Sequence, residues 1–228
     1  MKQNIKKVPS LKEQVYNYLK QALLNNEFEL GKLYSDQWVA GQLGVSRTPV
    51  REAVQQLKHE GFVKVVPYKG FTAKTISEKE IEEVFEAREA IEGFCIKKLV
   101  NNHQSRAAGH VRQKLEEIIA GQETSAQNNE RNKFWEMDSN FHQCIVNYSD
   151  NTILVNLYQS LGDKISRIAL ETLKENNRLT TALQEHKKTL EFINKEELLE
   201  AYESNYRHLL STKALMMEAL KKCMDSNS

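Results

Sequence analysis

The sequence contains few of the residues that interrupt or cross-link a chain. Its 228 residues include only 3 prolines, 9 glycines and 3 cysteines. So few chain breakers argue against a turn-rich all-β fold and favour long helices. Cys95, Cys144 and Cys223 are odd in number and form no Cys-x-x-Cys motif, which argues against a disulfide framework and against a cysteine metal site. We expect reduced thiols, as in a cytoplasmic protein.

Long apolar runs are absent as well. No stretch approaches the ~20 apolar residues that a membrane-spanning helix needs. The first ten residues, MKQNIKKVPS, are basic but lack the apolar core of a secretory signal peptide. Hydrophobic residues make up 40% of the chain and charged residues 28%, which suits a globular protein with a core. We therefore expect one or two domains, a cytoplasmic location and no membrane partner.

The net charge of +1 conceals an asymmetry along the chain. Residues 1–75 contain 12 Lys+Arg and 6 Asp+Glu, a balance of +6, and the remaining residues have a balance of −5. A basic N-terminal third is the electrostatic pattern expected of a segment that binds phosphates. An unevenly charged solvated surface would look the same, so charge alone does not decide the function.

The stretch from Ser35 to Gly61 reads SDQWVAGQLGVSRTPVREAVQQLKHEG and predicts two short helices joined by a turn. Ser35 and Ser46 stand where N-cap residues are expected, and Gly61 follows the second helix as a stop signal. One buried face of the second helix is predicted by i, i+3, i+4, i+7 spacing: Val50, Ala53, Val54 and Leu57. Arg47 and Arg51 are four residues apart, so they share a different face near the helix start. This is the layout of a helix-turn-helix DNA reader.

The flanking segments complete a winged helix-turn-helix. A preceding helix is predicted from about Ser10 to Asn26, with an apolar stripe made of Leu11, Val15, Tyr18, Leu19, Ala22 and Leu23. After the second helix, Phe62–Val66 and Phe71–Ala73 read as two strands joined by a turn at Pro67–Gly70, which is a β-hairpin wing. We expect this DNA-binding domain, of three helices plus the hairpin, over residues 8–76.

The segment Leu43-Gly44-Val45-Ser46-Arg47-Thr48-Pro49-Val50-Arg51-Glu52-Ala53 resembles the recognition-helix signature of the GntR family of bacterial transcription regulators. The resemblance implies a homodimer that reads an inverted-repeat operator in double-stranded DNA. The residues implied at the bases and phosphates are Gln37, Ser46, Arg47, Thr48 and Arg51. Those implied at the wing tip, near the DNA backbone or minor groove, are Tyr68, Lys69 and Gly70.

The rest of the chain predicts a second, all-α domain over residues 77–224. Ser77-Glu78-Lys79-Glu80 is a capping box that opens a new helix, and no strand signal follows it as far as Cys223. We expect an antiparallel bundle, which can hold a ligand or a metal between facing helices. Its six helices are predicted near 77–101, 105–122, 130–148, 151–175, 180–194 and 196–223.

A candidate metal site lies within this bundle. Asp138 and His142 are separated by four residues, so their side chains share one helix face, and His186 and His208 follow on later helices. Three neutral imidazoles and one carboxylate suit a divalent transition metal. A single helical histidine is more often structural or exposed, and we assign no ligand role to His59, His103 or His110.

The helical part resembles the FCD ligand-binding domain of FadR-type GntR regulators. Metal-binding members carry an Asp-x-x-x-His pair and two later histidines, which here match Asp138, His142, His186 and His208. Zinc is the first choice of metal for these ligands, with nickel or manganese compatible. The resemblance implies a role of this domain in homodimerisation. It also implies a small organic acid as effector, held by Arg88, with Arg167 as a weaker candidate. A plain surface pair of Arg88 with Glu89 or Glu92 is the alternative.

The function expected is a sequence-specific transcription regulator, acting as a repressor, whose operator binding responds to a small carboxylate at the metal site. Activation is also compatible with the family. One alternative is a metal-dependent, hydrolase-like enzyme, because a metal with open positions can activate water. Yet no H-E-x-x-H, G-x-S-x-G or P-loop motif is present, so we predict no catalytic residue. The other alternative is an effector-independent DNA-binding dimer with the bundle as its dimerisation module.

Overall fold

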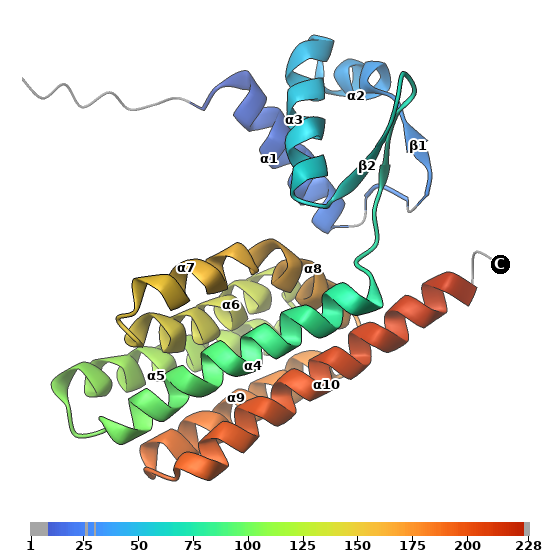
Figure 1. Ribbon diagram of the computed structural model, residues 1–228. Helices are drawn as coiled ribbons and strands as arrows, with labels where there is room; N and C mark the ends of the chain where they lie inside the picture. Colours follow the sequence, from blue (N-terminus) through green and yellow to red (C-terminus); the bar gives the residue numbers. More distant parts are fainter. Residues whose placement is uncertain (1–8, 26, 30, 226–228) are drawn as a thin grey trace, which may run out of the picture. The chain divides into compact units, whose positions relative to one another are not determined.

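The computed structural model describes residues 9–25, 27–29 and 31–225, with side chains up to residue 222 (Figure 1). Residue 8, Asn26 and the side chain of Cys223, which entered the expectations above, lie outside the described part. That part contains ten helices and three strands. The chain divides into two compact units, Met1–Thr75 and Ile76–Ser228, and each is considered by itself.

The N-terminal unit packs three helices against a small antiparallel sheet. The helices are α1 (Leu11–Leu24), α2 (Asp36–Leu43) and α3 (Arg47–His59), and the strands are β1 (Leu33–Tyr34), β2 (Val63–Val66) and β3 (Gly70–Ala73). The sheet order is β1-β3-β2, with Tyr34 opposite Phe71 and Val65 also opposite Phe71. The helix-turn-helix and the hairpin wing are therefore confirmed, but the short strand β1 was not predicted, because two residues are too few to show an alternating pattern.

Local capping explains where the two helices of the motif begin and end. The hydroxyl of Ser35 accepts the backbone N–H of Trp38 at 3.1 Å, which caps α2. Gly44 ends that helix in the left-handed conformation, with φ of +64°. Ser46 precedes α3, but its side chain accepts no capping N–H among the described residues.

The buried face predicted for α3 is confirmed, since all four of its apolar residues are at most 2% exposed: Val50, Ala53, Val54 and Leu57. The stripe predicted for α1 is partly wrong. Val15, Leu19 and Ala22 are buried, but Leu11 and Tyr18 are about half exposed, at 48% and 51%. Helix α1 packs mainly on one neighbour, α3, and its buried face is therefore narrower than its apolar stripe.

The C-terminal unit is an all-helical bundle made of seven helices. They are α4 (Glu78–Asn101), α5 (Arg106–Gln127), α6 (Arg131–Tyr148), α7 (Thr152–Ser160), α8 (Gly162–Thr172), α9 (Arg178–Asn194) and α10 (Leu198–Asp225). Helix α4 packs against α10 and α6, α5 against α6 and α9, and α9 against α10 (Figure 1). The capping box at Ser77 is present, with its hydroxyl 3.2 Å from the N–H of Glu80.

Two of the predicted helix ranges were wrong. The range 151–175 is split, because the N–H of Leu161 bonds to the carbonyl of Tyr158 three residues back and Gly162 then begins α8. The apolar periodicity runs through this junction, and Gly162 is a weak helix former that leaves room for the break. The helix predicted to end at 122 continues to Gln127, where no proline or glycine stops it.

The two cysteines that the structure describes are buried and free, as the sequence predicted. Burial raises the pKa of the Cys95 thiol to about 11 and also raises the pKa of Cys144. Both groups therefore remain protonated thiols near neutral pH, and they pack as small apolar side chains.

The wing generates a test of the N-terminal fold at Gly70. This residue has φ of +134°, and a Cβ built on it would lie 2.0 Å from the carbonyl oxygen of Tyr34. Gly70→Ala should lower the melting temperature of the N-terminal unit and separate β1 from β3. The matched control is Gly41→Ala in α2, where a Cβ would meet none of the described atoms within 4 Å. It should stabilise by up to ~1 kcal/mol. Equal melting temperatures for both variants in calorimetry would contradict this packing.

Candidate metal centre

Three helices of the bundle bring the four predicted ligands together. Asp138 and His142 lie one turn apart on α6, His186 lies on α9 and His208 on α10. One ligand atom from each residue lies within 4.8 Å of all the others. The four side chains are buried, with between 1% and 7% of each residue exposed. The structure therefore groups residues that are up to 70 positions apart in the sequence into one buried polar cluster.

The spacing of the ligand atoms fits one shared ion after a small contraction. Asp138 Oδ2 lies 4.0 Å from His142 Nε2, and Asp138 Oδ1 lies 3.7 Å from His186 Nε2. Two ligands of one zinc ion can be at most ~4.2 Å apart, which is twice the usual bond length. Both distances meet this limit, but the four ligand atoms together lie only within 4.8 Å of one another, so the cluster would need to close by less than an ångström.

The imidazole rings are close enough to oppose each other's protonation. Their centroids are 5.1 Å apart for His142 and His186, 5.0 Å for His142 and His208, and 4.5 Å for His186 and His208. Burial, reinforced by the neighbouring histidines and arginines, lowers the pKa of both His186 and His208 well below the usual value. These two rings are thus neutral near pH 7, which is the form that binds metals.

Each ring has a hydrogen-bond partner at its outer nitrogen. The Nδ1 atom of His142 lies 3.0 Å from Glu92 Oε2, that of His186 lies 3.0 Å from Gln122 Oε1, and that of His208 lies 2.8 Å from Glu185 Oε2. By contrast, Nε2 of His142 and of His186 is buried without a partner among the described residues. An unsatisfied buried nitrogen costs ~1–3 kcal/mol, so the inward lone pairs fit a cation.

The carboxylates behind the rings are themselves held by arginines. Glu92, which is fully buried, accepts hydrogen bonds from Arg88 Nε at 2.7 Å, Tyr158 Oη at 3.1 Å and Asn205 Nδ2 at 3.1 Å. Burial opposes ionisation of Glu92, but the charge of Arg88 and the hydrogen bonds from Arg88 and His142 outweigh it and hold its pKa below the ordinary value.

Glu185 occupies the equivalent position behind His208. It accepts a hydrogen bond from Arg178 Nη1 at 2.9 Å, and burial raises its pKa against the attraction of Arg178. The roles of Glu92, Gln122 and Arg178 were not predicted from the sequence. The only signal for Glu92 was its position four residues after Arg88 on the apolar side of α4.

Arg88 lies next to the cluster and is not a surface residue. It is 3% exposed, pairs with Glu92, and has its guanidinium carbon 5.8 Å from the centre of the Phe85 ring. The surface-pair alternative was therefore wrong about exposure, although the pairing with Glu92 is present. Its Nη2 atom is buried and finds no partner among the described residues. Arg167 on α8 lies near Glu80 and Asp163, and it is not among the described residues that line the cavity beside the cluster.

A cavity of about 220 Å³ reaches the cluster between α6 and the α7–α8 junction. Asp138 and His142 line it, together with Tyr158, and Trp135 and Gly162 contribute to its walls. Its volume is below the ~300–1,000 Å³ of pockets for drug-sized ligands, so it suits a smaller molecule. The split between α7 and α8 thus contributes to the opening of this cavity.

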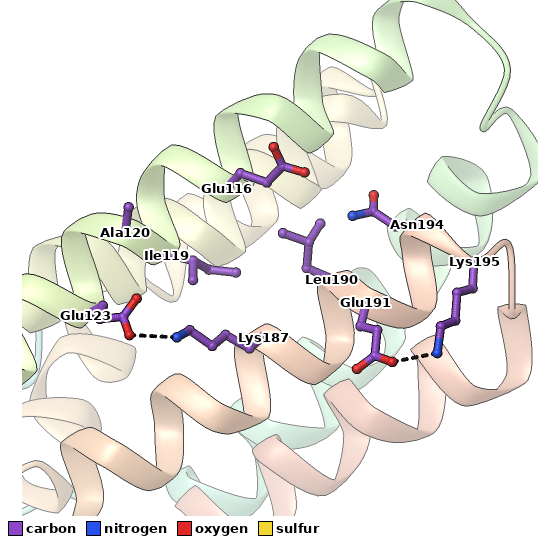
Figure 2. Close-up of a pocket in the computed structure, with 9 residues that line it drawn as sticks. All are labelled: Glu116, Ile119, Ala120, Glu123, Lys187, Leu190, Glu191, Asn194 and Lys195. Atoms are coloured by element: carbon purple, nitrogen blue, oxygen red, sulfur yellow. Dashed lines mark hydrogen bonds and ion pairs between the residues drawn. The ribbon is translucent and has the colours of Figure 1, made fainter.

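A larger groove lies away from the cluster, between α5 and α9 (Figure 2). Four of its charged side chains form two pairs: Lys187 Nζ lies 2.9 Å from Glu123 Oε1, and Lys195 Nζ lies 2.5 Å from Glu191 Oε1. The figure shows both pairs at the groove, with the apolar Ile119 and Leu190 between the helices. These paired, exposed charges mark an ordinary solvated surface.

The residues predicted to read DNA are accessible in the N-terminal unit. The exposed set comprises Gln37, Ser46, Arg47, Thr48, Arg51, Tyr68 and Lys69, whereas Gly70 is half-buried. Arg51 Nε donates to Asp36 Oδ2 at 3.1 Å, which holds one of the two arginines on the α2 side of α3. Tyr68 is fully exposed at the wing tip with φ of +62°. None of the described helices is long and apolar enough to cross a membrane.

Comparisons with known proteins agree with this architecture. Residues 11–72 match the family described as bacterial regulatory proteins, gntR family, and residues 83–211 match the FCD domain. An uncharacterized HTH-type transcriptional regulator of Bacillus subtilis, YdhC, is 26% identical over 80% of both chains. The HTH-type transcriptional repressor RspR of Escherichia coli K12 is 25% identical over 68% of this chain and 67% of its own.

A solved structure provides a comparison for the bundle. The Zn²⁺-bound FCD domain of TM0439 is 26% identical, with a TM-score of 0.51, over 64% of this chain and 98% of that domain. The FCD match alone spans more than half of the chain, which is enough to assign the chain to a family. The two relatives named above are regulators of transcription by name. The chain therefore belongs to the GntR family of bacterial transcription regulators, in the FadR-like group that carries an FCD domain.

Proposed function

We propose that the protein is a homodimeric, cytoplasmic repressor whose affinity for an inverted-repeat operator falls when a small organic acid binds at a metal site in the bundle. The observation that carries the proposal is the buried cluster of Asp138, His142, His186 and His208 in a chain that also has a helix-turn-helix. The names of two similar proteins support its parts, since RspR is a repressor and the TM0439 domain is Zn²⁺-bound.

At the DNA end, α3 acts as the recognition helix. Arg47 and Arg51 are exposed one turn apart at its start, so both guanidinium groups can enter one major groove. Asp36 holds Arg51 in the free protein, and an exposed pair of this kind costs at most ~1 kcal/mol to break. The wing tip, with Tyr68 and Lys69, would contact the DNA backbone or minor groove.

In the bundle, the three imidazoles, each in the neutral form that binds metals, and the carboxylate of Asp138 would hold one divalent cation. Zinc suits these nitrogen and oxygen ligands, and nickel or manganese is compatible. When bound, the metal supplies positive charge and open coordination positions. Burial raises the pKa of Asp138 in the metal-free protein, so a cation would favour its ionised form.

The same charges favour an anionic effector. Glu92 is paired with Arg88 and Glu185 with Arg178, which leaves Asp138 as the unpaired carboxylate among the described groups of the cluster. A divalent cation would therefore bring the site to a charge near +1, which attracts a carboxylate. Arg88 has a buried Nη2 without a described partner, so it can donate to the same effector, and Arg167 remains a second candidate.

The recognition helix generates the first functional prediction. Arg47→Ala and Arg51→Ala should each remove ~1–3 kcal/mol of base discrimination, because an arginine–guanine pair is lost. Lys58→Ala, in the last turn of the same helix, is the control and should keep the selectivity of the wild type. Lys69→Ala should weaken binding to all sequences alike and reduce its salt dependence. Gel-shift titrations over several salt concentrations measure this, and wild-type selectivity in both arginine variants would refute the assignment.

The metal site generates a second prediction. Adding Zn²⁺, Ni²⁺ or Mn²⁺ to metal-free protein should raise the melting temperature, because the ion binds only the folded cluster. His208→Ala should abolish the increase, and the exposed His59→Ala should retain it. Metal binding should weaken in acid as protons compete for the rings, but the lowered pKa values of His186 and His208 move this loss below the ordinary ~6.5. No thermal shift with any of the three metals would rule the site out.

The effector generates a third prediction. A screen of hydroxy acids and dicarboxylic acids should find one that weakens operator binding ~5–150-fold, the usual range of allosteric coupling. Arg88→Lys keeps the positive charge near Glu92 but loses the forked donor, so it should respond less. Operator titrations with and without the acid measure both effects. Release of the operator by an uncharged ligand, or a response of Arg88→Lys to the acid equal to that of the wild type, would contradict this mechanism.

A further inference from the structure

The outer nitrogens of the three clustered histidines are held by residues from three different helices. Glu92 of α4 holds His142, Gln122 of α5 holds His186, and Glu185 of α9 holds His208, with separations of 2.8–3.0 Å. Gln122 and Glu92 are both 0% exposed. Each holder contacts Nδ1, so the pattern is the same at all three rings.

This pattern selects one tautomer of each ring. A neutral imidazole carries a single N–H, and an ionised carboxylate can only accept a hydrogen bond. In a neutral ring, the hydrogen of His142 and of His208 would therefore reside on Nδ1, and Nε2 would keep a free lone pair. Gln122 presents Oε1 to Nδ1 of His186, which matches the same tautomer there. This arrangement agrees with the Nε2 atoms of His142 and His186, which are buried and have no hydrogen-bond partner among the described residues.

The three residues that contact the Nδ1 atoms differ in charge. The two carboxylates are each bound by an arginine, with Arg88 Nε 2.7 Å from Glu92 and Arg178 Nη1 2.9 Å from Glu185. Arg178 is fixed further by Thr212, whose Oγ1 lies 2.7 Å from Nη2. Gln122 adds no charge, and its Nε2 has no hydrogen-bond partner among the described residues. A third carboxylate at this position would have no described arginine to balance it.

We propose that Glu92, Gln122 and Glu185 are positioning residues that turn all three Nε2 lone pairs toward one cation, and that the neutral side chain of Gln122 keeps the loaded site cationic. The inference rests on the metal site of the proposed function. Gln122 then has two effects. Its oxygen orients His186 so that Nε2 faces the metal, and its lack of charge preserves the attraction of the site for an anion.

The first test needs no metal. Nitrogen-15 NMR of the imidazoles in metal-free, full-length protein should show the Nδ1–H form for His142, His186 and His208. The exposed His59 serves as the reference for an imidazole in solvent. In Gln122→Leu, His186 should lose its preference for Nδ1–H while the other two rings keep theirs. An Nε2–H form at any of the three rings in the wild type would overturn the proposal, whether or not the protein binds metal.

The second test uses Co²⁺, whose visible absorption reports binding, and acetate as the anionic probe. Gln122→Leu should bind Co²⁺ ~10–100-fold more weakly, the usual effect of losing an outer hydrogen-bond partner. Gln122→Glu should bind Co²⁺ more tightly and acetate more weakly than the wild type. The neighbouring Glu123→Gln, which changes an exposed residue paired with Lys187, should match the wild type in both.

The outcomes separate this inference from the proposed function. If the wild type binds no Co²⁺ but shows the three Nδ1–H rings, the metal proposal fails and the positioning stands. If the wild type binds Co²⁺ and Gln122→Glu binds acetate as tightly as the wild type, the metal proposal stands and the charge role of Gln122 is wrong.

Discussion

The bundle depends on satisfying polar atoms that it buries at its centre. Each imidazole of the cluster is supported from behind at Nδ1, and two of the three supports are carboxylates balanced by arginines. Without these partners the cost of burying the charged groups would be several kcal/mol for each ion. The inward nitrogens have no such support, and so the same arrangement that stabilises the outer atoms leaves lone pairs directed at a common point. A cation is the partner that we propose for them.

This constraint also suggests how the two ends of the chain can communicate. Helix α4 starts at Glu78, three residues after the N-terminal unit ends at Thr75, and it carries both Arg88 and Glu92. An effector that engages Arg88 therefore acts on the first helix that follows the DNA-binding unit. A ligand shifts an equilibrium only by its differential affinity for the two states, so in the proposed mechanism the position of α4 would have to differ between the operator-bound and released protein. Operator DNA would in turn weaken the effector by the same factor.

Much of this organisation could be predicted from the sequence. The caps at Ser35 and Ser77, the apolar face of α3 and the four clustered residues follow from local spacing or from family resemblance. Strand β1 was missed because its two residues have no periodicity of their own. The break at Leu161 was missed because apolar spacing continues across it. The supports of the imidazoles were missed because a buried glutamate or glutamine looks, in sequence, like one that faces solvent.

The most direct test of the account is X-ray absorption spectroscopy at the metal edge of protein purified without chelators. The account predicts one bound divalent ion with nitrogen and oxygen neighbours, at ~2.0–2.2 Å for zinc, and the outer scattering that imidazole rings produce. In His186→Ala the imidazole contribution should decrease. A sulfur neighbour, a spectrum unchanged in His186→Ala, or protein that contains no metal and takes none up would contradict the claim that these four residues form the metal site.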